Sequence, residues 1–300
     1  MQLPEPHGRG PCTDEPPRHL RPEAAAVERK ANMESSHFPA APVEPAAAYL
    51  GGKRNLARKV IARIAAIPHV TYLEPFIGMG GIFLRRPFRA RAEVINDIST
   101  DVANLFRILQ RHYVPLMDCL RWQLTGRAEF DRLRAANPST LTDLERAARF
   151  LYLQRLAFGG KVEGRNFGVT PTSSARFDVT KLGPALEAIH ERLAGVVIEH
   201  LPYEEVIRRY DRPGTLVYLD PPYFGCEEDY GEGVFGRDDF QRLAELLGGL
   251  QGRFLLSIND RPEIRKIFAG FEMQEVDLAY TVARNGKAPR ARELLISDSR

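Results

Sequence analysis

The most constraining feature of this 300-residue chain is an apolar run that ends at an acid. Residues 217–219 read as a buried strand, and Asp220, Pro221, Pro222 and Tyr223 follow directly. Proline has no amide hydrogen for a sheet ladder, so the chain must leave the sheet at Asp220. Ligands bind at the carboxyl ends of strands in open α/β sheets. An acid and an aromatic ring at such an end therefore indicate a site.

The chemistry of this segment suits an amino group. Asp220 supplies a charged acceptor, and the carbonyl of Pro221 supplies a neutral one. Two acceptors without a neighbouring donor match an exocyclic amine, and Tyr223 can stack on the flat ring that carries it. A plain turn capped by a packing tyrosine is the alternative, because Asp-Pro often begins turns.

Two upstream segments occur with this motif: Tyr49-Leu50-Gly51-Gly52-Lys53 and Glu74-Pro75-Phe76-Ile77-Gly78-Met79-Gly80-Gly81. Together, over about residues 47–298 and in the same order, the three resemble the Dam-like (DPPY-motif) DNA N6-adenine methyltransferase family. The resemblance implies an α/β fold, with a Rossmann-like sheet for S-adenosylmethionine-dependent methyl transfer and helices on both faces. It also implies a mainly helical inserted subdomain that recognises DNA. We expect a disordered tail over 1–40, a catalytic domain over 41–100 and 177–300, and the insertion over 101–176.

The same resemblance, with the glycine turn after a first strand near 70–73, predicts the residues that bind S-adenosylmethionine. They are Tyr49, Gly52, Lys53, Glu74, Pro75, Phe76, Gly78, Gly80, Asp97 and Asp220. Some of these have simpler explanations. Taken alone, the stretch around Lys53 favours a solvated surface lysine, and the glycines have a strand-to-helix turn as their alternative. Asp97, after a strand at 93–96, fits either a ribose contact or a helix cap. The G-x-G-x-x-G pattern of dinucleotide folds is missing, which argues against a nicotinamide oxidoreductase.

Basic residues in two loops, and one at the end of the helix before the first loop, are the candidates for DNA binding. The first loop, residues 158–169, follows three predicted helices at 100–110, 128–136 and 141–156. It interleaves aromatic and basic side chains. The second joins predicted terminal strands at 275–280 and 293–297. The predicted DNA contacts are Arg155, Lys161, Arg165, Arg284, Lys287, Arg290 and Arg292. Gln154 and Gly160 depart from the family's usual residues, which leaves the target sequence open. A solvated loop is the alternative for each.

Composition restricts the remaining possibilities. The net charge of +3 is compatible with a polyanionic partner without requiring one. Cys12, Cys119 and Cys226 form neither a disulfide framework nor a zinc pattern, so we expect no metal. Without a membrane-spanning run or a signal-peptide core, we expect a soluble cytoplasmic protein that lies at the nucleoid when bound to DNA.

The predicted function is site-specific methylation of duplex DNA at N6 of a flipped adenine, with S-adenosylmethionine as the donor. Asp220, Pro221, Pro222 and Tyr223 are the predicted catalytic residues. Methylation of RNA adenine and a catalytically silent DNA-binding protein on this scaffold remain alternatives. The recognised sequence, a companion restriction nuclease and the oligomeric state stay open.

Overall fold

The computed structural model describes residues 37–49, 53, 55–162, 164–168, 172, 174–227, 234–278 and 291–299. Within them, seven strands form one sheet in the order β5-β4-β2-β6-β7-β9-β8. The strands are β2 (Thr71–Glu74), β4 (Ala92–Asn96), β5 (Val197–Glu199), β6 (Thr215–Leu219), β7 (Arg253–Asn259), β8 (Glu272–Leu278) and β9 (Ala291–Ser297). The pairs from β5 to β7 are parallel, whereas β9 is antiparallel to both β7 and β8.

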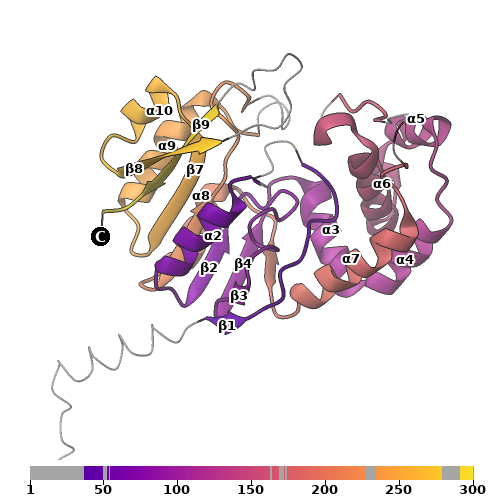
Figure 1. Cartoon of the computed structure of the whole chain (residues 1–300), viewed down its shortest axis with the longest axis horizontal. Helices are drawn as coiled ribbons and strands as arrows, with labels where there is room; N and C mark the ends of the chain where they lie inside the picture. The colour runs from indigo at the N-terminus through magenta and orange to yellow at the C-terminus, as the bar shows by residue number, and fades with distance from the viewer. Residues whose placement is uncertain are drawn as a thin grey trace, which may run out of the picture. The chain divides into compact units, whose positions relative to one another are not determined.

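Helices cover both faces of this sheet, as Figure 1 shows. They are α2 (Ala57–Ala66), α3 (Thr100–Arg111), α8 (Tyr203–Tyr210), α9 (Arg237–Gly248) and α10 (Pro262–Ile267). Alternate strand residues enter different cores. Tyr72 and Tyr218 pack with the side chains of α2 and α3, whereas Leu73 and Val217 pack with those of α8 and α9. This two-residue alternation in strands buried on both sides confirms the predicted α/β fold.

A helical region adjoins one edge of the sheet (right-hand side of Figure 1). It contains α4 (Tyr113–Arg121), α5 (Arg127–Ala135), α6 (Asp143–Leu156) and α7 (Val179–Arg192), with 3₁₀ turns at Pro138–Thr140 and Phe158–Gly160. α6 packs against α3, α4 and α5, and α7 packs against α3 and α4. The sequence pattern predicted α3, α5 and α6 closely but missed α4, whose apolar residues continue the pattern of α3 almost without a break.

A short two-stranded sheet joins β1 (Phe38–Pro39) to β3 (Phe88–Arg89). The sequence predicted a disordered tail over 1–40, which lacks a sustained apolar period, and order only from near Tyr49, whereas β1 lies inside that stretch. Pairing with a distant strand compensates for that missing pattern. The predicted domain limits stay predictions, since the helical region packs continuously against α3.

Candidate active site

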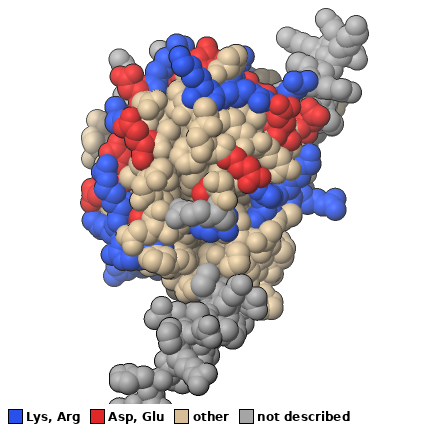
Figure 2. Space-filling view, turned by 90° about the vertical axis from the view of Figure 1, so that its left-hand side faces the viewer, with Lys and Arg blue, Asp and Glu red and all other residues tan. Residues whose placement is uncertain are grey.

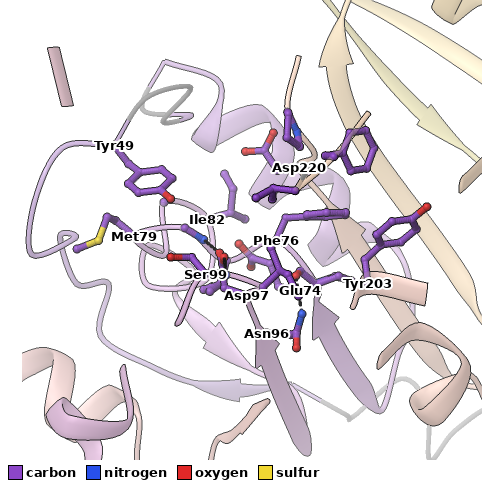
Figure 3. Close-up of a pocket in the computed structure, with 18 of the residues that line it drawn as sticks. Tyr49, Glu74, Phe76, Met79, Ile82, Asn96, Asp97, Ser99, Tyr203 and Asp220 are labelled. Atoms are coloured by element: carbon purple, nitrogen blue, oxygen red, sulfur yellow. Dashed lines mark hydrogen bonds between the residues drawn. The ribbon is translucent and has the colours of Figure 1, made fainter. Parts of the chain in front are cut away.

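The candidate site lies where the direction of chain travel through the sheet reverses. From β2 the chain moves outward to β4 and β5, and from β6 it moves the other way to β7. The carboxyl ends of β2 and β6 are therefore neighbours at a topological switch point, where α/β sheets bind ligands. A cavity of about 990 Å³ opens there. In Figure 3, Tyr49 and Met79 line one end and Phe76 and Tyr203 the other, with Asp220 and Asp97 on opposite walls.

Asp220 is held at the end of β6 by contacts from two other elements. The Nζ atom of Lys53 lies 3.0 Å from Asp220 Oδ1, and Ser257 Oγ on β7 donates to the same oxygen at 3.3 Å. Burial raises the pKa of Asp220 to about 6, although the charge of Lys53 and its hydrogen bond act to lower it. The carboxylate thus loses much of its solvation yet stays ionised above about pH 6.

Lys53 is buried in the turn just before α2, with 4% of its surface exposed. Besides Asp220, its ammonium donates to Tyr223 OH at 2.6 Å and to Glu293 Oε2 at 3.2 Å. Tyr223 OH in turn donates to Glu293 Oε1. These contacts argue against a solvated surface lysine, because a buried ammonium requires ionic and hydrogen-bonded partners. The tyrosine of the Asp-Pro-Pro-Tyr motif is thereby fixed at its hydroxyl.

Glu74 ends β2 beside Asp220 and is almost fully buried. Tyr72 OH donates to Glu74 Oε2 at 2.5 Å. Burial raises the pKa of Glu74 to about 8, and the negative charge of Asp220 adds to this rise. Glu74 is therefore largely protonated at neutral pH, which leaves Asp220 as the ionised carboxylate of this pair.

The glycine turn after Glu74 has two roles. Gly78 has φ +50°, and a Cβ placed there would lie 3.0 Å from the Tyr49 ring. Gly80 has φ +75°, and its Cβ would instead meet Leu84 at 2.9 Å. Gly78 therefore permits the approach of Tyr49 over the cavity, whereas Gly80 permits packing behind it.

Asp97 follows β4 and receives two backbone hydrogen bonds. Its Oδ2 accepts from Gly78 N and its Oδ1 from Ser99 N, both at 2.9 Å. Burial raises its pKa to about 6 against these two hydrogen bonds. The cap of α3 is Ser99, whose side chain accepts from Val102 N. Asp97 thus orients the glycine turn, and each carboxylate oxygen retains a second lone pair for a ligand.

Eight predicted residues of the cofactor site line one cavity: Tyr49, Lys53, Glu74, Pro75, Phe76, Gly78, Asp97 and Asp220. Pro222 also lines it, whereas Gly80, Pro221 and Tyr223 are not among its lining residues. Gly52 lies outside the described residues. The roles predicted for these residues in cofactor binding and catalysis stay predictions.

Several lining residues had no distinctive sequence signal. Asn96 donates to the carbonyls of Pro75 (2.9 Å) and Leu201 (3.0 Å), which joins two walls of the cavity. The ring of Tyr203 lies 5.5 Å from that of Phe76, and its OH donates to Asp239 Oδ1 at 3.0 Å. Its position as the first residue of a helix after a strand was the available clue.

The candidate DNA contacts differ in exposure and in their hydrogen-bond partners. Arg155 donates to the backbone carbonyls of Ala46 and Arg176, so its guanidinium fastens α6 to two other segments. Arg165 donates to Gln154 Oε1 at 3.2 Å. Lys161 is exposed, and 63% of the Arg292 side chain is exposed. Arg284, Lys287 and Arg290 lie outside the described residues.

Charge on one face of the molecule and the settings of Gln154 and Gly160 both bear on DNA recognition. On the side seen in Figure 2, basic and acidic side chains are interspersed, so that face presents no purely basic surface. Gln154 is buried and donates to the carbonyls of Ala48 (2.9 Å) and Gly160 (2.8 Å). A Cβ on Gly160 would lie 3.0 Å from the Ala48 backbone. These two residues hold the first loop against the segment that carries Tyr49.

The residues that the structure describes offer neither a membrane span nor a metal site. No helix among them is long and apolar enough to cross a bilayer. They also contain no group of three or more His, Cys, Asp or Glu side chains arranged to hold a metal ion.

Comparison with known proteins agrees with this geometry. Residues 49–282 match the family model of the D12 class N6 adenine-specific DNA methyltransferases. The type II methyltransferase M1.LlaDCHI of Lactococcus lactis subsp. cremoris is 23% identical, over 85% of this chain and 95% of its own length. The DNA adenine methylase of Haemophilus influenzae is 25% identical, over 74% and 82%. The type II methyltransferase M.CviBI of Paramecium bursaria Chlorella virus NC1A is 23% identical, over 70% and 81%.

The family model covers well over half of the chain, including the strand ends that build the cavity. The chain therefore belongs to the family of D12 class N6 adenine-specific DNA methyltransferases.

Proposed function

We propose that this chain methylates N6 of a specific adenine in duplex DNA, with S-adenosylmethionine as the donor and Asp220 as the acceptor for the reacting amine. The single observation that carries the proposal is the position of Asp220. It is a carboxylate at the switch point of the sheet, with 21% of its side chain exposed, and it opens onto a large cavity. Family membership supplies the class of base and polymer.

The cavity fits an adenosyl donor in size and chemistry. Its volume lies at the upper end of small-molecule sites, which leaves room for part of a second ligand. Phe76 and Tyr203 offer aromatic faces for a purine, and Asp97 offers carboxylate oxygens for ribose hydroxyls. The donor supplies an electrophilic methyl group on a positively charged sulfur.

Asp220 activates the amine by accepting one of its N–H bonds. Since Lys53 and Ser257 both reach Oδ1, we assign Oδ2 to the amine. With the Pro221 carbonyl accepting the second N–H, the nitrogen lone pair is drawn out of conjugation toward the methyl group. The new N–C bond forms as the S–C bond breaks, and the nitrogen then releases one proton to water. Asp220 stabilises the positive charge that develops on nitrogen in between.

The chain must also hold an adenine outside the duplex. Extrusion costs a few kcal/mol, and stacking on an aromatic ring returns roughly 1–3 kcal/mol per base. We assign Tyr223 to this stacking, since its hydroxyl is fixed by Lys53 and Glu293 and its ring cannot swing freely. The exposed Phe158, beside Lys161 in the first loop, offers a second aromatic surface to DNA.

Expression in a host that lacks adenine methylation tests the proposal and reveals the target. Long-read sequencing that detects modified bases is expected to find N6-methyladenine at one short recurrent sequence. An empty-vector culture and a culture expressing Asp220→Ala are the controls. Modified cytosine, or no modified base despite abundant soluble protein, would contradict the proposal.

A further inference from the structure

The most informative residue outside the recognised motifs is Glu293. It lies on β9, paired with Asn259 of β7 and Val276 of β8. Because β9 runs antiparallel to β7, its first residues reach the sheet edge where β6 and β7 end. Arg292 beside it is exposed, whereas only 2% of Glu293 is exposed. A carboxylate buried at the start of an apolar strand needs a specific reason.

Glu293 joins Tyr223 to Lys53, the residue whose ammonium contacts Asp220. Its Oε1 accepts the hydroxyl hydrogen of Tyr223, and its Oε2 lies 3.2 Å from Lys53 Nζ. Lys53 is separated from Glu293 by 240 residues and contacts Asp220 with the same ammonium. One side chain therefore fixes both the tyrosine hydroxyl and the lysine.

The charges of this cluster have a consequence for ligand binding. Lys53 alone would cancel the charge of Asp220 and leave a neutral pair. Glu293 adds a second negative charge, so the three side chains together carry a net charge of −1. Glu74 and Tyr218, which also face Asp220, contribute no charge at neutral pH, since burial raises the pKa of both. A net negative cluster attracts a cation in a poorly solvated cavity.

We propose that Glu293 is a positioning residue for methyl transfer, which holds Tyr223 and Lys53 in place and gives the site its preference for a positively charged donor. This inference rests on the function proposed above. The sulfur of the donor carries a positive charge before transfer and none afterwards, since it keeps the bonding electrons as the methyl group leaves. Glu293 therefore favours binding of S-adenosylmethionine over S-adenosylhomocysteine, the product.

Titration calorimetry with each of these two ligands tests the inference directly. Glu293→Gln keeps the size of the side chain and removes its charge. We expect it to weaken S-adenosylmethionine binding roughly tenfold, with S-adenosylhomocysteine binding changed less than about twofold. Glu275→Gln is the matched control: Glu275 pairs with Leu294, next to Glu293, but is exposed and bonded to Arg265. Glu275→Gln should bind S-adenosylmethionine and S-adenosylhomocysteine with wild-type affinity.

A second variant separates charge from geometry. Glu293→Asp keeps the charge but shortens the side chain. It should retain the preference for the charged ligand and lower kcat roughly tenfold or more, because Tyr223 and Lys53 are then less firmly held. This variant decides the question if Glu293→Gln fails to fold. Equal weakening of both ligands by Glu293→Gln, or loss of the preference in Glu293→Asp, would overturn the inference.

The same data distinguish failure of this inference from failure of the proposed function. If the wild-type protein binds neither ligand and methylates no DNA, the proposed function is wrong. If the wild-type protein binds both and methylates DNA, but Glu293→Gln leaves the preference unchanged, only the role of Glu293 is wrong.

Discussion

At the scale of single residues, the site depends on how charges are arranged around one carboxylate. Asp220 is ionised above about pH 6, Glu74 beside it holds its proton to about pH 8, and Lys53 is buried between acids. Environment alone gives two neighbouring carboxyl groups different protonation states, which is how a site assigns them different roles.

Replacing Asp220 with asparagine tests the central residue with little change in shape. The variant keeps a hydrogen-bond acceptor but loses the charge that stabilises the developing cation. We expect kcat to fall by roughly 10²-fold or more, with DNA affinity unchanged within a few-fold. Asp260→Asn is the control, since Asp260 directly follows the neighbouring strand β7 and pairs with Arg265. If Asp220→Asn had the wild-type kcat, Asp220 would not be the residue that stabilises the developing cation.

The dependence of activity on pH follows from the same carboxylate. Protonation removes the charge that the reacting amine requires, so activity is present above the pKa of Asp220 and is lost below it. With both substrates saturating, kcat should fall about tenfold per pH unit below a midpoint near 6. The burial of Asp97 predicts a separate loss of donor affinity in the same range, which appears in KM. An acid limb near pH 4 would mean that burial does not perturb Asp220.

At the scale of elements, the sequence predicted which segments end at the site but not how they are fastened together. Val217 to Leu219 was recognised as a strand because proline must end it, and that end is where the structure has it. The clamp between Phe224 and Asn259, with N···O distances of 2.9 and 3.0 Å, was not foreseeable. It depends on β6 and β7 being neighbours, which no local pattern encodes.

The glycine turn allows a sharp test at this scale. Gly78→Ala combines a positive φ with a Cβ 3.0 Å from the Tyr49 ring, whereas Gly195→Ala has φ +77° and open space around it. Both should lower the free energy of unfolding by about 1–2 kcal/mol through backbone strain. Gly78→Ala alone should also weaken S-adenosylmethionine binding, because Tyr49 must move. Equal ligand affinities in the two variants would show that this contact does not matter for the donor.

At the scale of the whole molecule, the fold class and family could be predicted because three motifs carry the strand ends of one sheet. The Lys53–Glu293 contact could not, since 240 residues separate the partners and Glu293 lies in no motif that the sequence revealed. Likewise, Arg155 reads as a free cation in the sequence, and only the tertiary structure reveals the carbonyls that it holds.

The salt dependence of DNA affinity tests whether the second basic loop belongs to the DNA-binding surface. Replacing Arg290 and Arg292 with alanine should lower the affinity for duplex DNA and reduce the slope of log K against log salt by up to roughly 2, or 0.9 for each lost phosphate contact. Arg208→Ala with Arg209→Ala is the matched control, since these exposed cations on α8 are paired with Glu204 and Glu205. An unchanged slope in the first variant would exclude this loop from the DNA interface.

The most direct measurement is mass spectrometry of the nucleosides released from DNA after incubation with the purified protein and S-adenosylmethionine labelled in its methyl group. A strand end that presents Asp220 to an exocyclic amine predicts labelled N6-methyl-2′-deoxyadenosine from duplex DNA, and none when Asp220→Asn is used. Label on cytosine, label on RNA alone, or equal label with Asp220→Asn would contradict it.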